Sequence, residues 1–310
     1  MGDRLLRPRP CRRADNLARC PYDEPVRNPG AGPHVSEMTV ADIEPAVGAI
    51  LADDWGDRRA WFEFAVGHPG CRVFVATDGA GGIVGTGVAT INGSTAWIGT
   101  IWVAPGHRGR GLGRALTQAP IDAAESAGCR TLVLVATDRG RPLYERMGFE
   151  VQTWYRTMEA PGLATGTEGS VPRIRPYRDD DLPAMSDLDR TATGEDRGHL
   201  LAALASSTGT QVLVGGGGDP RAFLIRAPWG GGATIAPDLD AAFGLLSARR
   251  RSYDPSRKVR CGILVENEAG AAALEADGWT EAWRAPRLVR GEPLEWHPEH
   301  IWGQFNHALG

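Results

Sequence analysis

The sequence lacks several features that would point to particular protein classes. Its cysteines are Cys11, Cys20, Cys71, Cys129 and Cys261, an odd and scattered set without C-x-x-C spacing. This pattern supports neither a disulfide framework nor a zinc site, so we expect no bound metal. No apolar run approaches the roughly 18 residues of a membrane-spanning helix. We therefore expect a soluble, cytoplasmic protein with no membrane partner.

An excess of positive charge is also missing. The chain has 34 Lys and Arg against 38 Asp and Glu, a formal net charge of −4, and Lys258 is its only lysine. Proteins that bind nucleic acid usually carry a basic patch or a basic net charge. We expect no nucleic-acid partner, and any anion has to be bound by a local group of arginines and backbone N–H groups.

The length of 310 residues suits two domains of ordinary size. Residues 1–34 are rich in Pro and Arg without apolar periodicity, and we expect them to be a disordered N-terminal extension. Residues 161–172 are rich in Gly, Pro, Ser and Thr and are typical of a linker. The predicted domains are therefore 35–160 and 173–310.

The first domain shows alternating helical and strand-like patterns. Ile43, Val47, Ile50 and Leu51 lie on one face of a predicted helix. Asp-Gly and Asn-Gly turns predict an antiparallel meander over 71–105. The predicted order is helix, meander, helix, strand, helix, strand, over 38–55, 71–105, 112–128, 130–137, 140–149 and 150–158.

Part of this pattern repeats in the second domain. "LVLVATDRGRPLYERMGFEV" aligns with "CGILVENEAGAAALEADGWTEA" at an offset of about 130 residues, which indicates an internal duplication. In this alignment Gly140 corresponds to Gly270, and Tyr144 corresponds to Leu274.

The stretch "APGHRGRGLGRAL", residues 104–116, lies between a predicted strand and a predicted helix. Such a loop directs backbone N–H groups and the positive end of the helix dipole at an anion. Its glycines allow close approach, and Arg108, Arg110 and Arg114 add charge. The dinucleotide fingerprint fails because Arg114 stands where its third glycine should be, and the Walker loop fails for lack of Gly-Lys-Ser/Thr.

The loop resembles the acetyl-CoA loop of the GNAT N-acyltransferases, V-x-P-x-x-R-G-x-G-x-G/A. The matching residues are Val103, Pro105, Arg108, Gly109, Gly111 and Gly113, and the later "LYERMGF" is similar to a second signature of the family. The resemblance covers about residues 35–160. It implies an α/β (α+β) GNAT fold, a mixed and mostly antiparallel sheet with flanking helices, in which the pantetheine arm enters between two splayed strands.

The resemblance also implies roles for individual residues. The cofactor-binding residues would be Ile101, Trp102, Val103, Arg108, Gly109, Arg110, Gly111, Leu112, Gly113 and Arg114, with acetyl-CoA as co-substrate. Tyr144 would be the general acid that protonates the departing thiolate. Asp54 is the candidate base, and the alternative is that it is a solvated surface residue without a catalytic role.

Residues 173–310 resemble a second, degenerate GNAT-like domain, as in the tandem-GNAT subfamily of YitH-like proteins, through "LDRTATGEDRGHLLAAL" and "IWGQFNHALG". At about the same offset the anion-loop positions fall near Asp240, Ala241, Phe243 and Leu245, so this copy should not bind CoA. The candidate acceptor-binding residues are Asp53, Trp97, Asp196 and Arg197, for which core packing, capping and ion pairing are the alternatives.

The sequence thus predicts an acetyl-CoA-dependent N-acetyltransferase. It would transfer the acetyl group to a primary amine of a small molecule, directly in a ternary complex, as a monomer or homodimer. The alternative is an acetyl-CoA-binding sensor or interaction protein without turnover. The acidic balance of the chain tilts the acceptor toward a cationic molecule.

Overall fold

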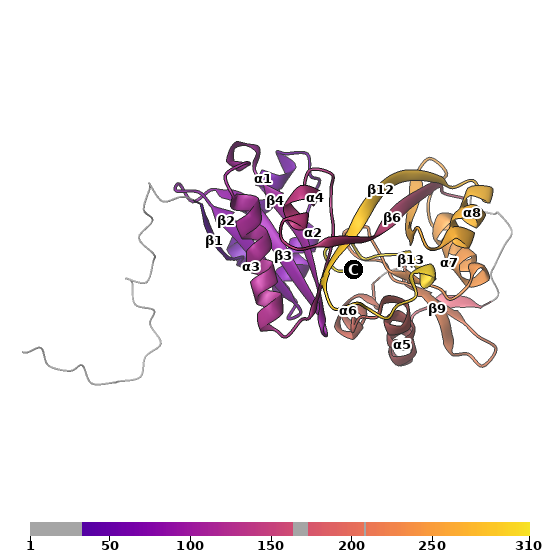
Figure 1. The fold of residues 1–310 in the computed structure, drawn as a ribbon. Coiled ribbons are helices and arrows are strands. Elements are labelled where there is room, and N and C mark those ends of the chain that lie inside the picture. Colours follow the sequence, from indigo (N-terminus) through magenta and orange to yellow (C-terminus); the bar gives the residue numbers. More distant parts are fainter. Residues whose placement is uncertain (1–32, 164–172, 208) are drawn as a thin grey trace, which may run out of the picture.

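The computed structural model describes residues 33–163, 173–207 and 209–310 (Figure 1). Residues 1–32 of the predicted N-terminal extension, most of the predicted linker, and Cys11 and Cys20 lie outside these ranges, whereas His34, predicted as the end of the extension, begins the first strand. Cys71, Cys129 and Cys261 are buried free thiols. In the described ranges no helix has the length and apolar character needed to cross a membrane.

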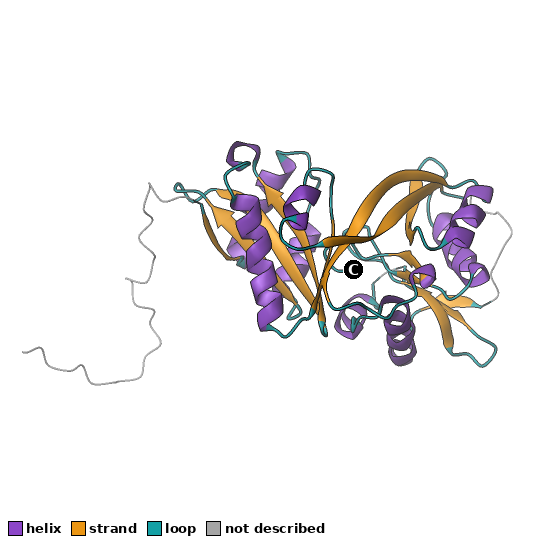
Figure 2. Ribbon diagram, viewed as in Figure 1, coloured by secondary structure: helices purple, strands orange, loops and turns teal. Residues whose placement is uncertain are grey.

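The first half contains six helical segments and six strands among the described residues (Figure 2). The strands are β1 (His34–Glu37), β2 (Cys71–Thr77), β3 (Ile83–Asn92), β4 (Thr95–Val103), β5 (Thr131–Val135) and β6 (Glu150–Pro161). The α-helices are α1 (Ile43–Leu51), α2 (Arg59–Gly67), α3 (Leu112–Ser126) and α4 (Arg141–Glu145). Two short 3-10 turns, η1 (Val40–Asp42) and η2 (Pro105–His107), precede α1 and α3 and bring the total of helical segments to six.

The second half repeats this order, and its first four strands are shorter than the corresponding strands of the first half. Its strands are β7 (Ile174–Pro176), β8 (Gln211–Val214), β9 (Pro220–Leu224), β10 (Thr234–Ile235), β11 (Lys258–Leu264), β12 (Thr280–Gly291) and β13 (Ile301–Gly303). Its helices are α5 (Leu182–Thr193), α6 (Gly198–Leu204), α7 (Leu239–Arg251) and α8 (Glu268–Ala276), with 3-10 turns η3 (Asp179–Asp181) and η4 (Pro298–His300).

The two halves exchange their long strands. One sheet has the order β1-β2-β3-β4-β5-β12-β6-β11, and a second sheet has the order β13-β10-β9-β8-β7. Thus β12 of the second half lies between β5 and β6, while β6 of the first half lies between β12 and β11, as the crossing ribbons in Figure 1 show. Leu288 of β12 is fully buried and faces Leu134 on one side and Val151 on the other. The sheet therefore crosses the domain boundary predicted at 160–173.

Helices cover both faces of the meander β2-β3-β4. Val73 and Val75 pack in the cluster that includes α1 and α2, whereas Ala76 packs with Leu112 and Leu116 of α3. This division follows from the alternation of side chains along a strand. Gly85 and Gly87 lie under α3, where an added Cβ would come within 2.3 Å of Leu116 Cδ1 and 2.4 Å of the Leu116 carbonyl oxygen. The glycines let α3 approach the sheet closely.

Most predicted elements of the first half are present. The meander is antiparallel, and Gly93 in its Asn-Gly turn has a φ of 68°. The helix before Gly128 ends as predicted, with Gly128 at a φ of 89°. Three details differ from the prediction: Leu51 is 45% exposed while Ile43, Val47 and Ile50 are buried, and β1 and α2 had not been predicted.

The anion-loop positions of the second copy lie inside a helix. Asp240, Ala241, Phe243 and Leu245 all fall within α7, and Ala241 and Leu245 are buried in the core of the second half. The helix begins at the N-cap Asp238, whose side chain accepts a hydrogen bond from Ala241 N–H. A carboxylate therefore occupies the end of the helix that binds an anion elsewhere.

Candidate active site between two splayed strands

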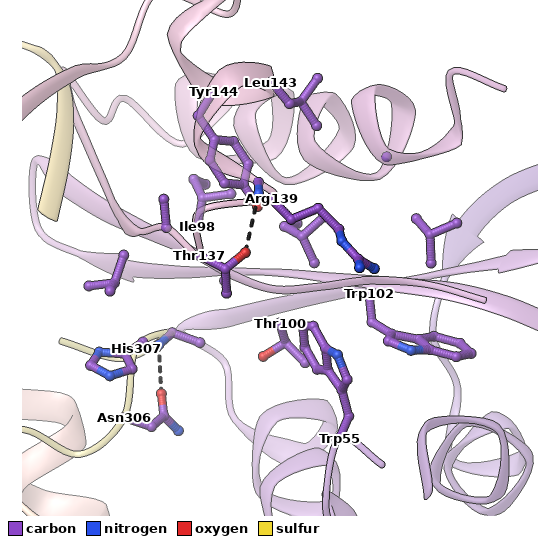
Figure 3. Close-up of a pocket in the computed structure, with 18 of the residues that line it drawn as sticks. Trp55, Ile98, Thr100, Trp102, Thr137, Arg139, Leu143, Tyr144, Asn306 and His307 are labelled. Carbon is purple, nitrogen blue, oxygen red and sulfur yellow. Dashed lines mark hydrogen bonds between the residues drawn. The ribbon is translucent and has the colours of Figure 1, made fainter. Parts of the chain in front are cut away.

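The strands β4 and β5 run parallel but separate after three residue pairs. Thr95, Ala96 and Trp97 pair with Thr131, Leu132 and Val133, and the register ends there although β4 continues to Val103. Beyond Val133, β5 keeps its pairing with β12 on its other edge. The carboxyl ends of β4 and β5 thus diverge and form two walls of a cavity of about 820 Å³ (Figure 3).

A β-bulge lies in the β4 wall. The register between β3 and β4 shifts between Thr86 and Val88, and Thr100 has a φ of 53°, a conformation that costs a β-branched residue about 1–2 kcal/mol. Two hydrogen bonds hold it: Trp61 Nε1–H donates to Thr100 Oγ1 at 3.0 Å, and Thr86 Oγ1–H donates to the Thr100 carbonyl at 2.8 Å. Because Thr100 lines the cavity, the bulge interrupts the ladder where a ligand could pair with the backbone.

The glycine-rich loop joins β4 to α3, as its sequence predicts. Gly109 and Gly111 have φ values of 76° and 82°, which favour glycine, and a Cβ at either would meet nothing within 4 Å. Backbone conformation, and not space, therefore requires these two glycines. Gly111 is the N-cap of α3 and provides no side-chain hydrogen bond to the helix. The first N–H groups of this 15-residue helix are left for an anion.

Arg108 is held in the wall of the loop. Its Nε–H donates to the Val103 carbonyl at 2.8 Å, and its guanidinium pairs with the Asp53 carboxylate. Trp102 Nε1–H donates to the same Asp53 oxygen at 2.9 Å. Asp53, predicted as an acceptor-binding residue, thus fixes the loop to β4. Arg110 and Arg114 are exposed beside α3, and in the described part of the chain neither forms an ion pair.

Tyr144 lines the cavity from α4, on the side opposite the tryptophans (Figure 3). Its ring lies against Phe149, with the ring centroids 6.4 Å apart. The turn before α4 is fixed by Gly140 N–H, which donates to Thr137 Oγ1 at 3.2 Å. Burial raises the pKa of Tyr144 to about 12, so its hydroxyl keeps its proton at neutral pH. The side chain can therefore donate a proton into the cavity.

The second half closes the far side of the cavity. Asn306, His307 and Ala308 of the C-terminal segment line it together with Trp229 and Trp283. Thr90 Oγ1–H donates to the Ala308 carbonyl at 2.6 Å, which attaches this segment to β3. Gly99 is needed here because its Cβ would lie 2.5 Å from Ala308 Cβ. Figure 3 shows Asn306 and His307 across the cavity from Thr137 and Tyr144.

His307 is a neutral imidazole in this wall. Burial, together with the nearby charge of Arg58, lowers its pKa to about 4. Its Nδ1 is buried and has no hydrogen-bond partner among the described residues, while its ring lies 5.3 Å from that of Trp283. His307 therefore has an unprotonated ring nitrogen at neutral pH, and it is a weaker base than a free imidazole. The sequence analysis missed it, because "IWGQFNHALG" indicated only family likeness and not a place in the cavity.

The other predicted acceptor residues lie outside the cavity. Asp54, the candidate base, is exposed in the turn after α1 with a φ of 56°. Trp97 is buried and donates its indole N–H to Glu195. Arg197 is buried and forms two hydrogen bonds with Asp189, at 2.9 and 2.6 Å. Asp196 is exposed next to it. Trp97 and Arg197 thus pack at the contact between the halves, and the cavity lining does not include them.

The charges of the cavity have one sign. Arg58, Arg108 and Arg139 line it, and no Asp or Glu belongs to the described lining. Among the ion pairs of the described residues, Arg108 pairs with Asp53, and neither Arg58 nor Arg139 has an acidic partner. A bound anion would therefore be stabilised near Arg58 and Arg139.

These features define a GNAT acetyltransferase fold, and comparison with known proteins agrees. Residues 40–149 match the sequence model described as the Acetyltransferase (GNAT) family, so this part of the chain is a GNAT acetyltransferase domain. It is similar to a curated protein of Bacillus subtilis (strain 168), the uncharacterized N-acetyltransferase YitH. The two are 25% identical over 219 residues, which cover 69% of this chain and 76% of the relative.

Two solved structures show that the fold is shared over both halves. A putative acetyltransferase from Pyrococcus horikoshii has a TM-score of 0.74 at 20% identity, covering 90% of this chain and 96% of its own. A GCN5-related N-acetyltransferase from Sphaerobacter thermophilus has a TM-score of 0.59 at 15% identity, covering 88% and 99%. These structures confirm the predicted fold class, and the predicted superfamily is confirmed by the family-model match and the YitH relative.

Proposed function

We propose that the protein is an acetyl-CoA-dependent N-acetyltransferase that acts on a primary amine of a small molecule. The observation that carries this proposal is the meeting of three elements at one cavity: the glycine-rich loop at the start of α3, the splayed ends of β4 and β5, and Tyr144. The GNAT family as a whole uses acetyl-CoA. The loop would hold the diphosphate, and residues 101–103 would pair with the pantetheine arm.

The chemistry would be direct transfer in a ternary complex. The amine nitrogen attacks the acetyl carbonyl, the C–S bond breaks, and the thiolate takes a proton for which Tyr144 is the proposed donor. Three arginines and apolar walls lower the pKa of a bound ammonium, since its charged form is disfavoured there. Neutral His307 is the proposed proton acceptor in place of Asp54, which lies outside the cavity.

The second half would complete the acceptor side and bind no CoA of its own. This rests on two observations: the corresponding loop positions lie within α7, and Asn306, His307 and Ala308 line the cavity of the first half. The lack of a carboxylate base in the described lining favours a second candidate, a sensor that binds acetyl-CoA without turnover.

Thiol release in the presence of an amine panel separates the two candidates. We expect acetyl-CoA to bind in calorimetry and at least one small amine to produce steady thiol release above hydrolysis. Binding of acetyl-CoA without thiol release from any amine would instead support the sensor.

A further inference from the structure

The acceptor side of the cavity contains an arginine without an acidic partner. Arg58 lies at the start of α2 and lines the cavity, and no salt bridge in the described part of the chain includes it. The adjacent Arg59 differs, because it pairs with Glu44 on α1. Burial lowers the pKa of Arg58, against the smaller opposing effect of Asp57. A half-buried guanidinium of this kind favours an anion from solution, and its planar donors suit a carboxylate.

Arg58 lies close to His307, on the proposed acceptor side of the cavity. Its charge acts on His307, which belongs to the wall that the second half contributes. It is also flanked along the chain by Trp55 and Trp61, and all three residues line the cavity. Arg108, in contrast, is bound to the loop and to Asp53. An anionic group at Arg58 would therefore belong to the acceptor.

The remaining walls on this side are aromatic. Trp55, Trp61, Trp229 and Trp283 line the cavity, and the rings of Trp61 and Trp229 meet edge to face with their centroids 5.3 Å apart. Trp61 Nε1–H is used by Thr100, and Trp229 Nε1–H donates to the Phe305 carbonyl at 2.9 Å. With its N–H group occupied, Trp229 offers apolar surface to a ligand, and Trp61, which is only 2% exposed, packs against it. Trp283 is 42% exposed, so part of this aromatic wall is open to solvent.

We infer that the amine acceptor carries a carboxylate and an aromatic or other apolar body, with Arg58 binding the carboxylate and the tryptophans packing against the body. This inference rests on the proposed function and names its substrate class. It replaces the cationic acceptor that the net charge of the chain suggested with one that carries a negative group. A polyamine would place a further ammonium among Arg58, Arg108 and Arg139, where the described lining has no counter-ion. A carboxylate neutralises Arg58 and leaves the amine to lose its proton.

Matched pairs of acceptors test this inference. The probes are tryptophan and phenylalanine, their methyl esters, the decarboxylated amines tryptamine and phenethylamine, and spermidine. We expect the kcat/KM of the amino acids to exceed that of the esters and amines by at least about tenfold, the value of one charge-assisted hydrogen-bonded contact. Higher kcat/KM for the esters, the decarboxylated amines or spermidine would overturn the inference and leave the proposed acetyltransferase in place.

Two variants of Arg58 and one of its neighbour sharpen the test. R58Q should lower the ratio of the amino-acid kcat/KM to the ester kcat/KM by about tenfold or more, while R58K should give an intermediate ratio. R59Q is the matched control and should leave this ratio as in the wild type, since Arg59 pairs with Glu44 away from the cavity. An equal effect of R58Q on acids and esters, with acetyl-CoA affinity intact, would show that Arg58 does not read the carboxylate.

Binding measurements keep the inference separate from turnover. Calorimetry with CoA present compares tryptophan with its methyl ester on the wild type and on R58Q. Carboxylate-selective binding that R58Q removes, without thiol release from any amine, would support the inferred ligand class and overturn the proposed catalysis. Equal binding of acid and ester to the wild type would overturn the inference.

Discussion

Trp97 donates its indole N–H to both carboxylate oxygens of Glu195, at 3.0 and 2.9 Å, and so joins β4 of the first half to the α5–α6 turn of the second. Both side chains are buried, and Asn92 Nδ2–H donates to the same carboxylate at 2.8 Å. One buried carboxylate of the second half therefore accepts hydrogen bonds from two side chains of the first half. E195A would leave the Trp97 N–H without a partner and Asn92 Nδ2 with the Leu309 carbonyl alone.

We expect E195A to lower the free energy of unfolding by about 3 kcal/mol, because unpaired buried polar groups keep their full desolvation cost. E292A is the control: Glu292 pairs with Arg130 at the surface, and both side chains are more than half exposed. Its effect should stay within about 0.5 kcal/mol. Denaturant titration of both variants measures the difference, and equal losses would contradict the role assigned to Glu195.

R108E should weaken acetyl-CoA binding by more than about tenfold, since it replaces a donor with a negative charge beside the proposed diphosphate site and beside Asp53. R108Q should give a smaller loss, because it removes the charge without adding repulsion. Calorimetry with acetyl-CoA measures both. Unchanged affinity in R108E would refute the assignment of the loop to the diphosphate.

Y144F should lower kcat by about 10²-fold with little change in acetyl-CoA affinity, if Tyr144 protonates the thiolate. The pKa of about 12 keeps this hydroxyl protonated over the whole working range, so no loss of wild-type activity below about pH 11 should come from its ionisation. Rates of the wild type and Y144F between pH 6 and pH 10 check both statements. Equal rates at every pH would exclude the role.

His307 should make the protein less stable in acid. Its pKa is about 4 when folded and about 6.5 when unfolded, so between these values the unfolded chain takes up a proton that the folded chain does not. Stability is then unaffected above about pH 6.5 and falls as the pH drops toward 4. H307Q should lose less stability over this interval than the wild type.

Denaturant midpoints at pH 7 and pH 5 measure this difference. Burial also lowers the pKa of His68, His199 and His300, so the wild type has several contributions of the same sign. Only the difference between the wild type and H307Q isolates His307. Parallel pH profiles for the two proteins would show that His307 is solvated in solution.

A chain that ends at residue 163 should not form a stable monomer. It lacks β11 and β12, so β6 would lose both neighbours and β5 would lose one. Unpaired strand edges favour aggregation or strand exchange between molecules. Size-exclusion chromatography with light scattering should show oligomers or loss of soluble protein. A well-folded monomer would mean that the first half closes its own sheet.

A cut within residues 164–172 of the intact protein is the matched experiment. The two fragments should stay together through size-exclusion chromatography at neutral pH, because β6 and β12 remain paired over a long register. Separation of the fragments without denaturant would show that the pairing of β6 with β12 does not hold the two halves together.

The sequence predicts the features that are local in the chain. The turn glycines, the loop before α3 and the short helix with Tyr144 each occupy a few consecutive residues, so their spacing is enough to identify them. The strand exchange is different, because β5 pairs with β12, about 150 residues away in the chain. The next strand along the chain, β6, has a sequence pattern similar to that of β12. Periodicity cannot tell which of two similar strands fills one place in a sheet.

The acceptor side shows the same limit. Arg58 and His307 are separated by most of the chain, and neither belongs to a recognisable motif. Asp54 and Asp196 have the residue type expected of a site, but both are exposed outside the cavity. Arg197 donates to Asp189 and Trp97 donates to Glu195, so both side chains have buried structural partners. Composition cannot separate a buried structural ion pair from a substrate contact.

The reciprocal pairing of β6 and β12 restricts how such proteins can be recombined. A chimera joined at the linker would combine a first half from one relative with a second half from another, and each half would then have to complete its sheet with a foreign strand. Transferring a new acceptor specificity to such a protein therefore requires moving β6, β12 and the C-terminal segment together. The unit of inheritance in this architecture is the interlocked pair and not the single copy.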